Sequence, residues 1–179
     1  MRLFIAIDFE DRIKDQIYQR AMELKQYAES GSFTRRDNLH LTLAFLGEIP
    51  ADEIGGILKV MEQSKTDMFT MEVEGAGKFL RGSEAIYWCG IKNSESLLDL
   101  QRKLVQGFKE LGYAVDDKPY RPHITLGRRC RMRPEFSMET YQKEITPIYI
   151  RVEKVSLMKS ERVDGKLRYT EIGSRDLIK

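Results

Sequence analysis

The sequence is poor in the residues that build metal sites and disulfide frameworks. Its 179 residues include 2 cysteines and 2 histidines. Cys89 and Cys130 lie far apart and outside any Cys-x-x-Cys arrangement, so neither a disulfide nor a zinc site is expected from them. We predict that both cysteines are reduced and structural.

Long apolar runs and a strong charge of either sign are also missing. No window reaches the roughly 18 apolar residues of a membrane-spanning helix. The stretch from Met1 to Asp8 runs into acidic residues without a signal-peptide cleavage pattern, so we expect a cytoplasmic protein without membrane association. The formal net charge of +2 is too small to indicate a partner, and no aromatic motif of an RNA-recognition domain is present.

What the sequence does contain is typical of one soluble globular domain. Apolar residues make up 41% and charged residues 32%, and 179 residues are enough to bury a core without cross-links. We expect a single bilobal domain over residues 1–179, present as a monomer.

The most informative feature is a short motif that occurs twice. His40-Leu41-Thr42-Leu43 is repeated as His123-Ile124-Thr125-Leu126, and these are the only histidines in the chain. Side chains alternate between the two faces of a strand, so each motif places an imidazole and a hydroxyl on one face and apolar side chains on the other. The pattern therefore predicts two strands, each anchored in a core and presenting polar groups to a cleft.

The repeat extends beyond the motifs. The motif positions differ by 123 − 40 = 83, and this offset places a predicted helix at 11–28 on a second one at 94–111 and the strand around Ile5 on Trp88. We predict an α+β fold with two pseudo-symmetric lobes, from duplicated halves of roughly 1–83 and 84–179. An approximate two-fold axis would bring one histidine to each side of a central cleft.

Other elements follow from apolar periodicity and turn residues. We expect the first helix to end at Gly31, a helix over 52–64, a loop at the basic segment 128–134, and a hairpin turn at 163–166. The expected strands are 3–7, 39–46, 69–73, 85–91, 123–127, 148–157 and 167–172.

Two opposed histidines suit an in-line displacement at phosphorus. One imidazole can accept a proton from the incoming oxygen while the other protonates the departing oxygen, because an unperturbed imidazole titrates near ~6.5. The hydroxyls of Thr42 and Thr125 can donate to non-bridging oxygens. Two alternatives are structural histidines and a zinc site. The duplication argues against the first, and the second lacks an obvious third ligand.

The two motif regions carry a family resemblance. Residues 38–48, Asn-Leu-His-Leu-Thr-Leu-Ala-Phe-Leu-Gly-Glu, and 121–128, Arg-Pro-His-Ile-Thr-Leu-Gly-Arg, resemble the paired signatures of the 2H phosphoesterases. They are most similar to the branch of RNA 2′,3′-cyclic phosphodiesterases, historically called 2′-5′ RNA ligases. Phe33 is one departure, since many members of the family carry a tryptophan there.

The resemblance implies a fold, an activity and a set of site residues. The fold would be two lobes with antiparallel sheets around a groove and helices on the outside. The reaction would be hydrolysis of a 2′,3′-cyclic phosphate at an RNA 3′ end to a 2′-phosphate, without metal or nucleotide cofactors. His40 would protonate the leaving O3′ and His123 would activate water. Arg128 stands where the family carries an arginine, and its planar guanidinium could pair with phosphate or stack on a base.

Several alternatives stay open at this point. The same site could act on another cyclic phosphate, such as a small cyclic nucleotide or an ADP-ribose cyclic phosphate, or run in reverse as 2′-5′ ligation. A non-catalytic RNA-binding module is a third possibility, and Arg128 could be a solvated strand-end residue. Aromatic residues are more often core than base-stacking platforms, and a positive rim is expected from arginines that flank the motifs. The aromatic residues in question are Phe45, Tyr120 and Trp88. The arginines that flank the motifs are Arg35, Arg36, Arg121, Arg129, Arg131 and Arg133.

Overall fold

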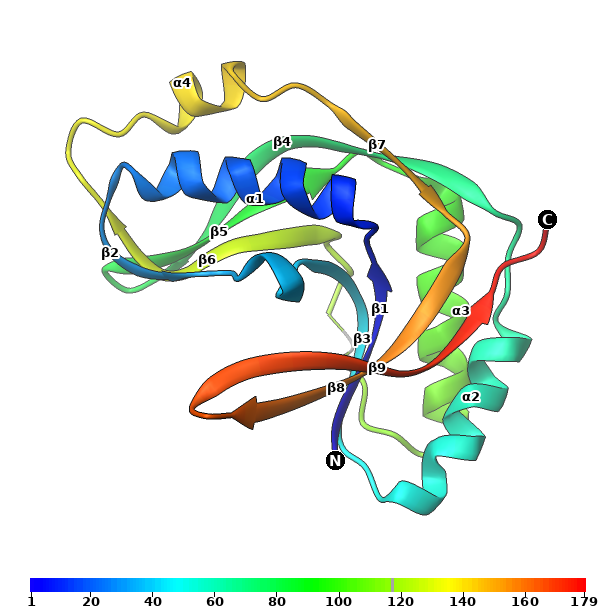
Figure 1. The fold of residues 1–179 in the computed structure, drawn as a ribbon. Coiled ribbons are helices and arrows are strands. Elements are labelled where there is room, and N and C mark those ends of the chain that lie inside the picture. Colours follow the sequence, from blue (N-terminus) through cyan, green and yellow to red (C-terminus); the bar gives the residue numbers. More distant parts are fainter. Residues whose placement is uncertain (117) are drawn as a thin grey trace.

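The computed structural model describes residues 1–116 and 118–179 and has an α+β fold built on two antiparallel sheets (Figure 1). The four-stranded sheet has the order β3 (His40–Glu48), β1 (Arg2–Asp8), β8 (Lys154–Val163) and β9 (Lys166–Asp176). The five-stranded sheet has the order β2 (Ala28–Phe33), β6 (His123–Met132), β5 (Glu84–Ile91), β4 (Phe69–Arg81) and β7 (Ile148–Val152). The predicted fold class is therefore confirmed.

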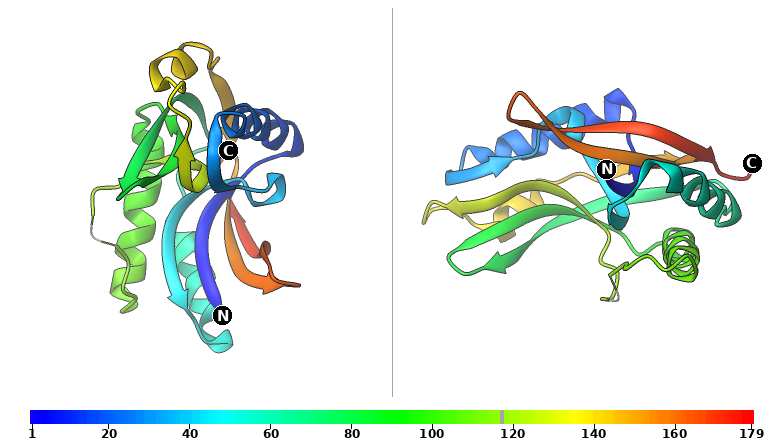
Figure 2. Two further views of the ribbon diagram at one scale, coloured as in Figure 1. Left: turned by 90° about the vertical axis from the view of Figure 1, so that its left-hand side faces the viewer. Right: turned by 90° about the horizontal axis from the view of Figure 1, so that it is seen from below.

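The helices lie on the outside, and two of them pack against the sheet that they do not directly follow. They are α1 (Asp11–Lys25), α2 (Ile54–Gln63), α3 (Glu95–Glu110) and α4 (Met138–Lys143), with 3-10 turns η1 (Arg36–Asn38) and η2 (Ala51–Glu53). α1 follows β1 of the four-stranded sheet but contacts β2, β6 and β7 of the other sheet, whereas α3 follows β5 and contacts β3. The right-hand view of Figure 2 shows the β8–β9 hairpin in one layer and the strands β4, β5 and β6 in another. No helix in the described ranges is both long and apolar enough to cross a membrane.

Local sequence explains the elements that were predicted well. The apolar run of β1 is buried on both faces, and α1 buries a stripe of Ile13, Ile17, Ala21 and Leu24. In α3 the Ser94 hydroxyl caps the first turn by accepting from the Leu97 N–H at 3.3 Å. The turn at Asp164 and Gly165, both with positive φ, joins β8 to β9 as predicted.

Three predicted boundaries were wrong because sheet pairing overrides local pattern. α1 ends at Lys25, and Ala28–Phe33 forms β2 beside β6. The basic segment at 128–134 continues β6 as far as Met132, because β2 and β5 flank it. The single strand expected at 148–157 is two strands, β7 and β8, that belong to different sheets.

The two motif strands have matching partners. Ala6 of β1 lies opposite Thr42 and Asp8 opposite His40, while Trp88 and Gly90 of β5 lie opposite Thr125 and His123. Both ladders also contain a bulge at the same place, between Ile5 and Ala6 in one and between Tyr87 and Trp88 in the other. Trp88 therefore corresponds to Ala6, one residue away from the Ile5 equivalence that the offset of 83 predicts.

Candidate active site

The two histidines begin their strands and make the same backbone hydrogen bond. His40 Nδ1 lies 2.7 Å from the Asn38 carbonyl oxygen, and His123 Nδ1 lies 2.7 Å from the Arg121 carbonyl oxygen. A carbonyl oxygen can only accept, so in both rings Nδ1 carries the proton. In the neutral ring Nε2 therefore holds the free electron pair, which is the tautomer that a general base needs.

The surroundings of the two Nε2 atoms differ. His40 Nε2 is 2.9 Å from Thr42 Oγ1, whereas His123 Nε2 has no hydrogen-bond partner among the described residues. Burial lowers the pKa of both imidazoles from the usual value, and the backbone carbonyls partly oppose this. The carboxylate of Asp8 also raises the pKa of His40. Among the described residues, no acidic group acts in this way on the pKa of His123.

Arg128 is a cation that acts electrostatically on both histidines. Its guanidinium lowers the pKa of His40, of His123 and of Tyr169. His40 and Tyr169 belong to the four-stranded sheet, whereas His123 and Arg128 belong to β6 of the other sheet. The structure therefore brings the sequence-predicted Arg128 within electrostatic range of both motifs.

Aromatic rings surround each histidine. The ring centroids of Phe4 and Tyr169 lie 4.9 and 5.1 Å from that of His40. Those of Phe79 and Trp88 lie 5.1 and 6.1 Å from that of His123. The sequence analysis missed Phe4, Phe79 and Tyr169. Strand alternation could have found Phe4, because it occupies the same face of β1 as Ala6, which pairs with Thr42.

Among the other aromatic residues, Phe45 departs from the expectation of burial. Its side chain is 58% exposed, and its ring lies 5.9 Å from that of Phe4. Tyr120 packs against the main core, as predicted, and its hydroxyl donates to the Thr42 carbonyl oxygen at 2.7 Å. In the other lobe, the Thr34 hydroxyl donates to the Thr125 carbonyl oxygen at 2.8 Å. Thr34, which precedes the first motif strand, thus holds the backbone of Thr125. Tyr120, which precedes the second motif strand, holds the backbone of Thr42.

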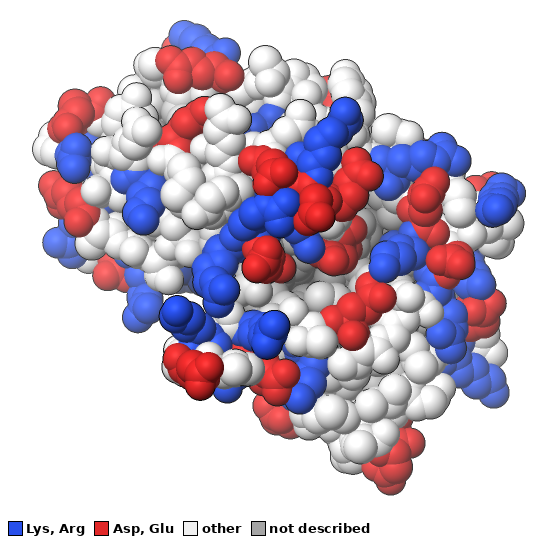
Figure 3. Space-filling model, viewed as in Figure 1, with Lys and Arg blue, Asp and Glu red and all other residues white. Residues whose placement is uncertain are grey.

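The expected positive rim is only partly formed. Arg36 is engaged by Asp11, Asp15 and Asp37 at 3.1, 2.5 and 3.5 Å, so its charge is already compensated. Figure 3 shows basic side chains where the upper and lower parts of the molecule meet, interspersed with acidic ones. In the part of the chain that the structure describes, no three His, Cys, Asp or Glu side chains gather in a way that could hold a metal ion.

Comparison with known proteins places this arrangement in a family. Residues 11–164 match the 2′-5′ RNA ligase superfamily. A protein of Escherichia coli K12 and one of Archaeoglobus fulgidus, both named RNA 2′,3′-cyclic phosphodiesterase, are 35% and 32% identical to this chain over 129 and 136 residues. The aligned parts cover 71% of each chain for the first protein, and 75% of this chain and 76% of the relative for the second.

Solved structures share the fold over nearly the whole chain. The apo form of E. coli LigT superimposes with a TM-score of 0.82 at 30% identity, covering 99% of this chain and 98% of LigT. The protein TT0787 of Thermus thermophilus gives 0.80 at 25% identity with the same coverage. The two facing sheets, each with a His-x-Thr strand, define an α+β fold of the phosphoesterase type. The chain belongs to the 2′-5′ RNA ligase superfamily.

Proposed function

We propose that this enzyme hydrolyses the 2′,3′-cyclic phosphate at an RNA 3′ end to a 2′-phosphate, with His123 as base, His40 as acid and no metal ion. The observation that carries the proposal is the identical anchoring of the two imidazoles through Nδ1, which leaves both Nε2 atoms for proton transfer. Family membership and the names of the relatives give the substrate class. We further propose that the protein acts as a cytoplasmic monomer.

The proton transfers balance in one displacement. His123 Nε2 takes a proton from water as the water oxygen bonds to phosphorus, and the imidazolium of His40 gives its Nε2 proton to O3′ as the P–O3′ bond breaks. His123 suits the base role because its Nε2 has no partner among the described residues. His40 suits the acid role because Asp8 favours its charged form.

Thr42, Thr125 and Arg128 would bind the phosphate. Thr42 Oγ1 lies beside His40 Nε2, so a phosphate oxygen within reach of the acid is also within reach of this hydroxyl. Thr125 is the equivalent residue of the other motif, and Arg128 supplies a positive charge that acts on both histidines.

The test is an oligonucleotide ending in a 2′,3′-cyclic phosphate, incubated with enzyme and a chelator. We expect a 2′-phosphate as product, and a loss of about 10²- to 10⁴-fold in rate for His40→Ala and for His123→Ala. The double variant should lose far less than the product of the two single effects, because the residues act as one unit. Unchanged circular dichroism would show that the variants fold.

Other outcomes would contradict parts of the proposal. Full activity in either variant would refute the two-histidine mechanism. Turnover of small cyclic nucleotides alone would mean that these, and not RNA ends, are the substrate. A 2′-5′-joined product would point to ligation. Binding of the oligonucleotide without any turnover would leave a non-catalytic RNA-binding module.

A further inference from the structure

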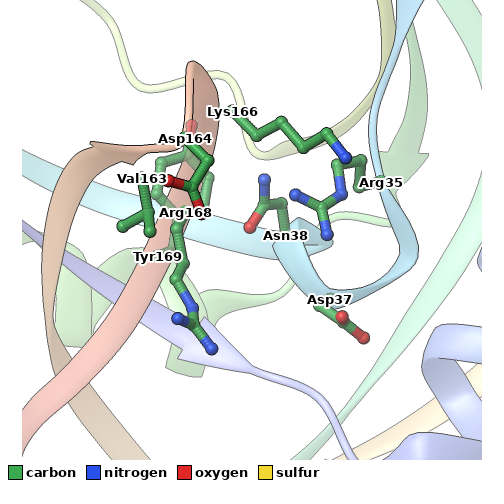
Figure 4. A pocket seen from close by; sticks show the side chains of 8 residues that line it. All are labelled: Arg35, Asp37, Asn38, Val163, Asp164, Lys166, Arg168 and Tyr169. Carbon is green, nitrogen blue, oxygen red and sulfur yellow. The ribbon is translucent and has the colours of Figure 1, made fainter.

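A polar cavity lies next to the His40 side of the site and has no role in the mechanism above. Its volume is about 410 Å³, and it lies between η1 and the β8–β9 hairpin (Figure 4). The lining residues are Arg35, Asp37, Asn38, Val163, Asp164, Lys166, Arg168 and Tyr169. Three of these are cations, and they come from two separate parts of the chain.

The cavity adjoins His40 through two of its lining residues. The Tyr169 ring lies 5.1 Å from the His40 ring, and the Asn38 carbonyl oxygen accepts from His40 Nδ1 at 2.7 Å. The Asn38 amide in turn donates to the Leu167 carbonyl oxygen at 3.0 Å, which joins η1 to β9. A group bound in the cavity would therefore be separated from the acid by a single layer of side chains.

The cations of the cavity are uncompensated. Within residues 1–116 and 118–179, Arg35, Lys166 and Arg168 form no ion pair and no side-chain hydrogen bond. Figure 4 shows the side chains of Lys166 and Arg35 pointing toward each other, whereas Asp37 points away from both. Asp37 also pairs with Arg36. Asp164, the other acid that lines the cavity, forms no ion pair with a described residue.

Two like charges that lie close together repel each other, and an anion bound between them offsets this repulsion. We propose that this cavity binds the internucleotide phosphate that precedes the cyclic end of the RNA, an inference that rests on the function proposed above. Arg35 and Lys166 would hold the phosphate oxygens, with Arg168 adding to the positive field. The tips of the β8–β9 and β4–β5 hairpins project from the same side of the molecule, which gives the RNA strand a direction of exit (Figures 1 and 2).

The proposal predicts a preference that depends on substrate length. A nucleoside 2′,3′-cyclic monophosphate has no internucleotide phosphate, whereas a tetranucleotide ending in the same cyclic phosphate has one in reach of the cavity. Lys166→Ala and Arg35→Ala should each lower the ratio of kcat/KM for the tetranucleotide to kcat/KM for the mononucleotide by about threefold to tenfold, the scale of one partly exposed charge-assisted contact.

Two controls make the effect specific. Lys166→Arg keeps the charge and should keep the ratio. Lys143→Ala removes another exposed lysine, on α4, where it pairs with Glu139 at 2.7 Å, and should also keep the ratio. In the salt dependence of tetranucleotide affinity, Lys166→Ala should reduce the slope of log K against log salt by about 0.7, the value for one phosphate contact on a single strand.

The experiment separates this inference from the proposed function. An unchanged ratio and slope in both alanine variants of an active enzyme would overturn the subsite and leave the function standing. An equal loss on both substrates would also overturn it, because the residues would then serve the shared site. If the wild-type enzyme turned over neither substrate, the function would fail. Equilibrium binding of a tetranucleotide ending in a 2′-phosphate, compared between wild type and Lys166→Ala, would still decide the subsite.

Discussion

At the scale of single residues, the two motifs are alike in sequence but not in environment. Thr42 Oγ1 is hydrogen-bonded to His40 Nε2, whereas Thr125 Oγ1 has no hydrogen bond to another described residue. Thr42 therefore contacts the proposed acid before substrate binds, and Thr125 is left for the substrate alone. Because of this difference, variants of the two threonines can separate the contact with a histidine from the contact with the substrate.

Replacement of each threonine by valine tests the hydroxyls without changing side-chain shape. We expect Thr42→Val and Thr125→Val each to slow single-turnover hydrolysis by about 10- to 1000-fold, the scale of a lost hydrogen bond to developing charge. Thr42→Val should in addition move the high-pH limb of the profile, which reports loss of the proton from the acid His40, because His40 Nε2 loses its partner. Thr125→Val should not move this limb. Rates equal to wild type in both variants would leave the threonines as strand-forming residues only.

At the scale of secondary-structure elements, a glycine allows a strand to carry part of the site. Gly77 of β4 lies directly opposite Trp88, and a Cβ at this position would lie 2.3 Å from two atoms of the Trp88 ring. The Trp88 ring in turn lies beside His123. The segment around Gly75 and Gly77 is part of β4, and the missing side chain of Gly77 makes room for the indole.

The same substitution at two glycines should therefore have opposite effects on stability. Gly77→Ala should lower the free energy of unfolding by about 1–3 kcal/mol through overpacking, and should slow hydrolysis by displacing Trp88. Gly55→Ala should raise it by about 0.4–1 kcal/mol, because Gly55 is an exposed helical residue with nothing within 4 Å of the added Cβ. Denaturant titration measures both. A stabilising Gly77→Ala would show that the ring moves aside at no cost.

Elements and site residues were predictable to the extent that local pattern determines them. The motif strands, α3 and the β8–β9 turn depend on periodicity, caps and turn residues within the segment. β2 has mostly exposed polar residues and becomes a strand only because it pairs with β6. Tyr169 reaches His40 through the order β3-β1-β8-β9, a pairing that no local pattern contains. The histidines and threonines could be proposed as site residues because the motif is repeated.

At the scale of the whole molecule, each lobe depends on parts of the other. α1 and α3 each cover the sheet that they do not follow, and the Thr42 carbonyl is held by Tyr120, which precedes the other motif strand. Arg128 also links the two sheets electrostatically, because its charge lowers the pKa of one histidine in each sheet. The duplication into halves of 1–83 and 84–179 remains our proposal, and the matching bulges of the two ladders support it.

The shared charge makes a prediction for the pH dependence of the whole enzyme. The profile of kcat/KM should be bell-shaped, because one imidazole must be protonated and the other neutral, and it reports the pKa values of the free enzyme. Burial and Arg128 both lower the pKa of His40 and of His123, so the bell should be centred below the usual ~6.5 of imidazole. A chelator should leave the profile unchanged.

Arg128→Gln is the variant that tests this electrostatic link. A positive charge disfavours a nearby imidazolium and lowers its pKa, so its removal should raise both pKa values and move both limbs to higher pH. The two fitted values belong to the coupled pair, so the joint displacement is the quantity to compare. Arg131→Gln, in the same strand, is the control, since Arg131 is not among the charges that change the pKa of His40 or of His123. A shift of one limb alone would confine Arg128 to one motif. Unmoved limbs would refute its placement between the two histidines.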